Sequence, residues 1–144
     1  MTTDLLPRRA HLLVVSTRYS PEELEARLGM RPDATVHAIG PDEISRRRHR
    51  EENTWELHEE GTSDADITEL VESLYARARP ITDKLRELKA EGCTVALSLI
   101  LRLSPADPYG AGFAVSRELL EWLNDAGIEF VDVDQYIFPD ADGS

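Results

Sequence analysis

Hydrophobic and polar residues alternate most regularly between Thr94 and Leu103. Every second residue there is Val or Leu, at positions 95, 97, 99, 101 and 103, and the residues between include Thr94, Ser98 and Arg102. Successive side chains of a strand point to opposite faces of a sheet, so this period of two predicts a strand with one fully buried face.

Four other segments have strand patterns. Residues 10–18 are a short apolar run rich in Val and Leu, which is typical of a strand covered on both faces. Residues 35–39, 54–59 and 128–138 are the other three. In the segment 54–59, Trp55 and Leu57 share one face of the predicted strand, and Glu56 and His58 share the other.

Three segments have helical patterns. Ser20, Pro21 and Glu23 form a capping box with proline in the first turn, and Gly29 ends that helix. A longer helix is predicted from about residue 64 to 91, kinked at Pro80. Its apolar stripe consists of Ile67, Leu70, Val71, Leu74, Ala78, Ile81, Leu85 and Leu88. Ser116 begins a third helix, which ends at Gly127 and for which Leu119, Leu120 and Leu123 are the predicted buried face.

These elements follow one another as β-α-β-β-α-β-α-β, which contains the βαββαβ order of the split-βαβ, or ferredoxin-like, domain. The sequence therefore predicts an α+β fold with a single mixed, mostly antiparallel sheet. It would have a ferredoxin-like core plus an extra helix and strand, with the helices packed on one face. We expect one domain over residues 10–138, with frayed ends at 1–9 and 139–144.

The net charge of −12 argues against binding to nucleic acids or to anionic membranes. No segment approaches the roughly 20 apolar residues that span a bilayer. Cys93 is the single cysteine, so an intrachain disulfide is impossible, and a small core residue is the favoured interpretation. We expect a cytoplasmic protein, and no cofactor motif is present.

The charges are distributed unevenly. Residues 118–144 contain eight acidic residues and no Lys or Arg, whereas residues 46–50 are Arg-Arg-Arg-His-Arg. Two binding surfaces follow from this distribution. The acidic candidates are Glu118, Glu121 and Asp125, which would attract a basic partner. The second set is Arg48, Arg50 and Trp55, which could grip an anion, although a solvated loop and a core tryptophan are the favoured alternatives.

One pair of residues is a candidate for binding a metal ion. Asp132 and Asp134 lie two residues apart on a predicted strand, so both carboxylates project from one face and could bind a divalent cation. A solvated strand face is the simpler interpretation. The four histidines match no local metal motif, although His37 and His58 lie on strands that could pair.

Several short segments occur here in the order and spacing of a known bacterial family. They are Leu28-Gly29 with Pro32, Gly40, Trp55-Glu56-Leu57, Lys84–Leu88 before Gly92, Gly112-Phe113 before Ser116–Leu120, and Asp132–Tyr136. In this arrangement the chain resembles the family known as domain of unknown function 4279, over about residues 10–137. The family shows a Lys-Gly-Asp-like triplet near the second strand, where this chain has Ile39-Gly40-Pro41-Asp42. The resemblance supports the predicted fold and implies no catalytic residues.

The absence of a recognised catalytic motif, together with the charge, favours a non-enzymatic protein-binding domain. One form of it is an immunity-type protein that neutralises a basic toxin. The alternatives are a small-molecule or anion sensor at Arg48, Arg50 and Trp55, and a divalent-metal-dependent enzyme at Asp132 and Asp134.

Overall fold

The computed structural model describes residues 8–38, 52–62, 65–103 and 113–137. The strands are β1 (Arg8–Ser16), β2 (Ala34–Val36), β3 (Asn53–Gly61), β4 (Thr94–Leu103) and β5 (Phe130–Ile137). The helices are α1 (Pro21–Leu28), α2 (Ile67–Ala78), the 3₁₀ turn η2 (Arg79–Ile81), α3 (Thr82–Ala90) and α4 (Arg117–Asp125). No helix in these ranges has the length and apolarity that crossing a membrane requires.

The five strands form one mixed sheet in the order β2-β3-β1-β4-β5. The β2–β3, β3–β1 and β1–β4 pairs are antiparallel, and the β4–β5 pair is parallel. The first four strands, connected as βαββαβ, form the split-βαβ core, and α4 is the crossover that a parallel β4–β5 pair requires. The predicted α+β class is confirmed.

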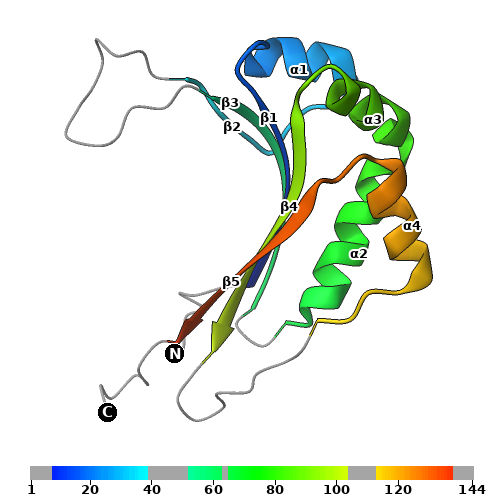
Figure 1. The fold of residues 1–144 in the computed structure, drawn as a ribbon. Coiled ribbons are helices and arrows are strands. Elements are labelled where there is room, and N and C mark those ends of the chain that lie inside the picture. The colour runs from blue at the N-terminus through cyan, green and yellow to red at the C-terminus, as the bar shows by residue number, and fades with distance from the viewer. Residues whose placement is uncertain (1–7, 39–51, 63–64, 104–112, 138–144) are drawn as a thin grey trace, which may run out of the picture.

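All the helices lie on one side of the curved sheet (Figure 1). Ala10, Leu12 and Val14 of β1 have no exposed surface, whereas His11 and Leu13 between them are half-buried. β1 is therefore covered on one face, and the expectation of a strand covered on both was wrong. The other side of the sheet, called the open face below, carries the alternate side chains of β1, β3, β4 and β5.

The capping box that begins α1 is formed as predicted. The Ser20 hydroxyl accepts a hydrogen bond from the Glu23 backbone N–H (3.1 Å), and the Glu23 carboxylate accepts one from the Ser20 N–H (3.0 Å). Gly29 ends the helix with φ of 68°, a left-handed conformation that glycine adopts without steric penalty.

The long helical segment is interrupted where Pro80 was expected to kink it. α2 and α3 are separated by the single 3₁₀ turn η2, which contains the exposed Pro80. The apolar stripe continues through this turn, because Leu74, Ala78, Ile81 and Leu85 are all buried. The proline bends the backbone while the same face of the segment stays on the core.

The predicted buried face of α4 was wrong at one position. Leu120 is 56% exposed, whereas Trp122 is only 3% exposed. Leu119, Trp122 and the half-buried Leu123 follow the i, i+3, i+4 spacing of one stripe, and Leu120 falls outside it. The Trp122 indole N–H donates to the Thr82 hydroxyl (3.2 Å), which satisfies its polar atom inside the core.

Some boundaries also differ from the predicted ones. β1 begins at Arg8 rather than at residue 10, and β5 begins at Phe130 rather than at residue 128. Most of the segments expected to be frayed, residues 1–7 and 139–144, lie outside the described ranges.

Candidate functional site

The three acidic residues proposed from the sequence lie on one exposed side of α4. Glu118, Glu121 and Asp125 are spaced i, i+3 and i+7, so their carboxylates form a single stripe along the helix. The Glu118 carboxylate accepts a hydrogen bond from the Tyr75 hydroxyl of α2 (3.1 Å). The stripe therefore borders the line along which α4 meets α2.

A shallow groove of about 180 Å³ runs along this line, and we call it the α2–α4 groove. It is lined by Tyr75, Arg79, Thr82, Glu118, Glu121, Trp122 and Asp125. The rings of Tyr75 and Trp122 lie with centroids 5.3 Å apart and planes tilted by 51°, so the groove has an aromatic floor. Figure 1 shows α4 (orange) beside α2 (green), two segments that are far apart in the sequence.

The electrostatics of the groove favour a cation. Three carboxylates face one guanidinium, that of Arg79, which gives the lining a formal charge of −2. Arg79 lies over the Tyr75 ring, 5.6 Å from its centroid, in the geometry of a cation–π interaction. Burial and the neighbouring Glu118 carboxylate raise the pKa of Tyr75, so the phenol stays neutral at physiological pH. An aromatic floor with an acidic rim can bind a lysine or arginine side chain.

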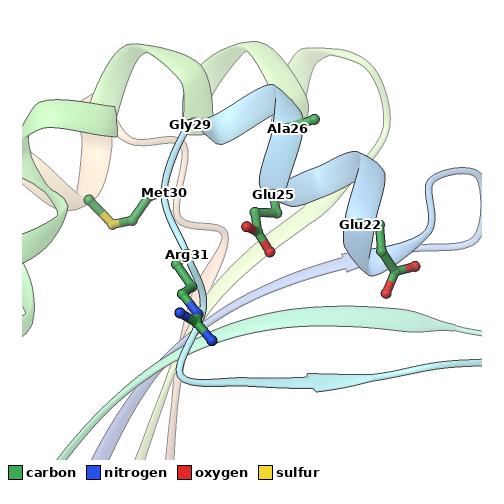
Figure 2. Close-up of a pocket in the computed structure, with 6 residues that line it drawn as sticks. All are labelled: Glu22, Glu25, Ala26, Gly29, Met30 and Arg31. Atoms are coloured by element: carbon green, nitrogen blue, oxygen red, sulfur yellow. The ribbon is translucent and has the colours of Figure 1, made fainter.

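A second hollow, of about 400 Å³, lies beside α1 and is lined by Glu22, Glu25, Ala26, Gly29, Met30 and Arg31. Figure 2 shows Glu25 and Arg31 projecting into the space between α1 and the neighbouring strands. Its lining has no aromatic ring, and the Glu22 carboxylate is 2.8 Å from His37. This hollow is therefore less suited than the α2–α4 groove to hold a specific ligand.

The anion-binding set is not assembled in the described residues. Arg48 and Arg50 lie outside them. Trp55 has no exposed surface, and its indole N–H donates to the Met30 carbonyl oxygen (3.1 Å). Trp55 is therefore part of the core, as its alternative interpretation held, and a ligand at the surface cannot stack on it.

Asp132 and Asp134 lie on the edge strand β5, on the open face. Their partners on β4 are Ser98 and Ile100. Asp132 is exposed and Asp134 is half-buried. Among the described residues, neither belongs to a group of three potential metal ligands.

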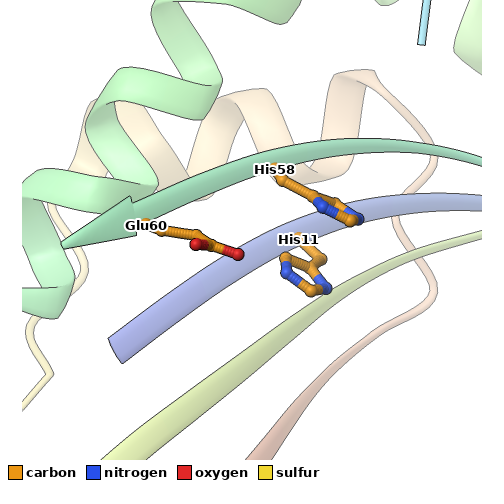
Figure 3. Close-up of side chains that lie close together, drawn as sticks. All are labelled: His11, His58 and Glu60. Atoms are coloured by element: carbon orange, nitrogen blue, oxygen red, sulfur yellow. The ribbon is translucent and has the colours of Figure 1, made fainter. Parts of the chain in front are cut away.

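The open face carries a side-chain cluster that the sequence did not predict. His11 of β1 is directly opposite His58 of β3, and the two rings stack with centroids 3.7 Å apart and planes 14° apart. Figure 3 shows the Glu60 carboxylate pointing toward these rings. One potential ligand atom of each residue lies within 4.8 Å of those of the other two.

Charged side chains surround this cluster, and the His11 ring is partly buried among them. His58 Nε2 is 2.7 Å from a Glu56 oxygen, and Arg9 Nε is 3.3 Å from a Glu60 oxygen, although without hydrogen-bond geometry. Nε2 of His11 is buried and has no hydrogen-bond partner in the part of the chain that the structure describes. Burial, and to a lesser extent His58, lowers the pKa of His11 to about 4, so this ring is neutral at pH 7.

β2 and β3 pair as the sequence allowed, but their register does not bring His37 to His58. His37 lies just beyond β2 and contacts Glu22 instead. The partner of His58 is set by the β1–β3 register, which depends on contacts between distant segments and leaves no local signal in the sequence.

Comparisons with known proteins give one match. Neither the curated proteins nor the solved structures contain a significant match to this chain. The family described as Domain of unknown function (DUF4279) matches residues 7–138. This match covers nearly all of the 144 residues. The chain therefore belongs to the DUF4279 family.

Proposed function

We propose that this protein is a non-enzymatic protein-binding domain, and that its α2–α4 groove receives a basic side chain of a partner protein. The observation that carries the proposal is the combination of the Tyr75–Trp122 floor with the carboxylates of Glu118, Glu121 and Asp125 in one groove.

The dimensions of the groove support a side chain rather than a larger ligand. A volume of about 180 Å³ is below the range of roughly 300–1,000 Å³ that is usual for small-molecule pockets. It is large enough for the end of one arginine or lysine side chain. Aromatic and arginine anchors in small pockets are the groups that most often dominate the affinity of protein interfaces.

The charge of the whole chain supports the same kind of partner. A net charge of −12 attracts a basic protein at long range and accelerates association, with a strong dependence on ionic strength. Leu120, which is 56% exposed on α4, adds apolar surface on the same helix. An immunity-type role, in which the domain neutralises a basic toxin such as a nuclease, is one function of this class.

An affinity pull-down tests the proposal. The tagged wild-type protein is incubated with its native lysate and washed at low and then high salt, and the eluate is identified by mass spectrometry. We expect to recover one basic protein in an amount equal to that of the tagged domain, and we expect high salt to release it. The variant with Glu118→Lys, Glu121→Lys and Asp125→Lys should not retain it.

The matched control carries Glu25→Lys, Glu69→Lys and Glu87→Lys, three exposed acids on α1, α2 and α3. It changes the net charge by the same amount and leaves the groove intact, so it should retain the partner. Equal losses in both variants would mean that only overall charge matters, which contradicts the proposed groove. Retention of the partner by both variants would also contradict it.

A further inference from the structure

The sheet register brings three potential metal ligands together on the open face. His58 and Glu60 are two residues apart on β3 and so point to the same side, and His11 is directly opposite His58 on the antiparallel neighbour β1. We propose that His11, His58 and Glu60 bind one divalent transition-metal ion of the zinc type. This site is separate from the α2–α4 groove, which lies on the helical side of the molecule (Figure 1).

The distances are close to those of a metal site. Zn²⁺ bonds to imidazole nitrogen and carboxylate oxygen at about 2.0–2.2 Å, so two ligand atoms of a tetrahedral site are about 3.3 Å apart. The three ligand atoms here lie within 4.8 Å of one another. The two imidazole rings would have to leave their stacked arrangement for their nitrogen lone pairs to point at one ion.

The surrounding groups match those of known metal sites. A metal-bound histidine usually directs its other ring nitrogen to a carboxylate, which fixes the orientation of the ring. His58 Nε2 already contacts Glu56, at 2.7 Å, and this leaves Nδ1 as the nitrogen that can bind the ion. The Glu56 carboxylate is itself held by the Thr54 hydroxyl (2.8 Å), so the contact is supported in turn.

A second, independent observation points to a ligand: the buried Nε2 of His11 has no hydrogen-bond partner among the described residues. A buried nitrogen without a hydrogen bond is costly, and few such groups remain in folded proteins without an explanation. A metal ion would give this ring a partner.

The ligand set selects the class of ion. Two imidazole nitrogens and one carboxylate suit Zn²⁺ and neighbouring transition metals, whereas Ca²⁺ and Mg²⁺ prefer oxygen ligands alone. Three protein ligands leave a fourth position for water or for an exogenous group. Arg9 opposes binding, because its guanidinium is 3.3 Å from Glu60 and must release that carboxylate.

Calorimetric titration of the untagged 144-residue chain with Zn²⁺, after removal of metals by a chelator, tests the site. We expect one equivalent to bind, Co²⁺ to give the visible absorption of a tetrahedral complex, and Ca²⁺ and Mg²⁺ not to bind. His11→Ala and His58→Ala should abolish Zn²⁺ binding. If a histidine variant fails to fold, the conservative variant Glu60→Gln, which removes the carboxylate ligand, should lose binding in its place. His37→Ala, the matched control, should bind normally.

Two further variants separate a metal site from nonspecific binding. Glu56→Gln should weaken Zn²⁺ binding by about tenfold or more, because it removes the partner that orients His58. Arg9→Ala should strengthen binding, because it frees Glu60. A wild-type protein that binds no Zn²⁺, or that binds it equally well without His58, would overturn the proposal. The triple lysine variant of α4 should bind Zn²⁺ normally, so this test does not depend on the proposed function.

Discussion

The neutral His11 ring on the open face makes the stability of the fold depend on pH in a defined direction. Burial lowers the pKa of His11 from 6.5 to about 4, with smaller effects from His58 and Arg9 in the same direction and from Glu56 and Glu60 in the opposite one. Between these two pH values the unfolded chain takes up a proton at His11 and the folded chain does not. The free energy of unfolding contributed by this group is therefore complete above pH 6.5 and is lost as the pH falls to about 4.

The magnitude follows from the size of the pKa difference. One pKa unit corresponds to about 1.4 kcal/mol, so the full shift would give about 3.5 kcal/mol. The ring is only half-buried, and solvent screening reduces the expected contribution to about 1–2 kcal/mol.

Urea unfolding of the wild type and of His11→Gln at pH 7.5 and pH 4.5, with a chelator present, measures this contribution. Other groups titrate in the same range, so the informative quantity is the difference between the two proteins. Relative to the wild type, the variant should gain about 1–2 kcal/mol on acidification. The control His37→Gln removes a histidine ring that is exposed rather than buried, so it should show no such gain. A difference between wild type and His11→Gln that is the same at both pH values would show that His11 does not contribute to the pH dependence of stability.

Three other properties can be measured with single variants. Leu74→Ala should lower the free energy of unfolding by about 2–5 kcal/mol, because it leaves a cavity beneath α2. Leu120→Ala should change the free energy of unfolding little, because Leu120 is exposed. Equal losses in urea unfolding would contradict the exposed position of Leu120 on α4. Arg77 contacts two carboxylates, at 2.8 and 2.9 Å, so Arg77→Met should cost about 1–2 kcal/mol in the same assay. Arg86→Met removes an exposed ion pair within α3 and should have almost no effect on the free energy of unfolding. A larger loss for Arg86→Met than for Arg77→Met would exclude a structural role for Arg77. Burial raises the pKa of the Cys93 thiol, so a thiol reagent should label it only in denaturant; rapid labelling of the folded protein would contradict its place in the core.

Local patterns in the sequence predict most of the elements, because their causes are local. The alternation of Val95 to Leu103 identifies β4, whose residues Val95 to Leu101 of this pattern are buried, and the capping box at Ser20 and Glu23 defines the start of α1. Pro80 correctly marks the interruption between α2 and α3. Each of these signals depends on side chains within a few residues of one another.

The candidate sites could be predicted only in part, because they depend on contacts between distant segments. The acidic stripe at Glu118 is visible in the sequence, but its aromatic floor requires Tyr75, which lies 43 residues earlier. The choice between Leu120 and Trp122 as a buried residue depends on where α4 meets α2. The pairing of His11 with His58 depends on strand register, which a shift of one residue would abolish.

The two tryptophan indole N–H signals in an NMR spectrum can report whether the α2–α4 groove accepts basic side chains. A hexa-arginine peptide is titrated into the ¹⁵N-labelled protein, with a hexa-glutamate peptide as the control. The indole N–H signal of Trp122, in the groove, should shift with arginine, whereas that of the core residue Trp55 should not. The shift should disappear in the Glu118→Lys, Glu121→Lys, Asp125→Lys variant. A Trp122 signal that does not respond to the peptide, or that responds equally in this variant, would show that the α2–α4 groove does not bind basic side chains.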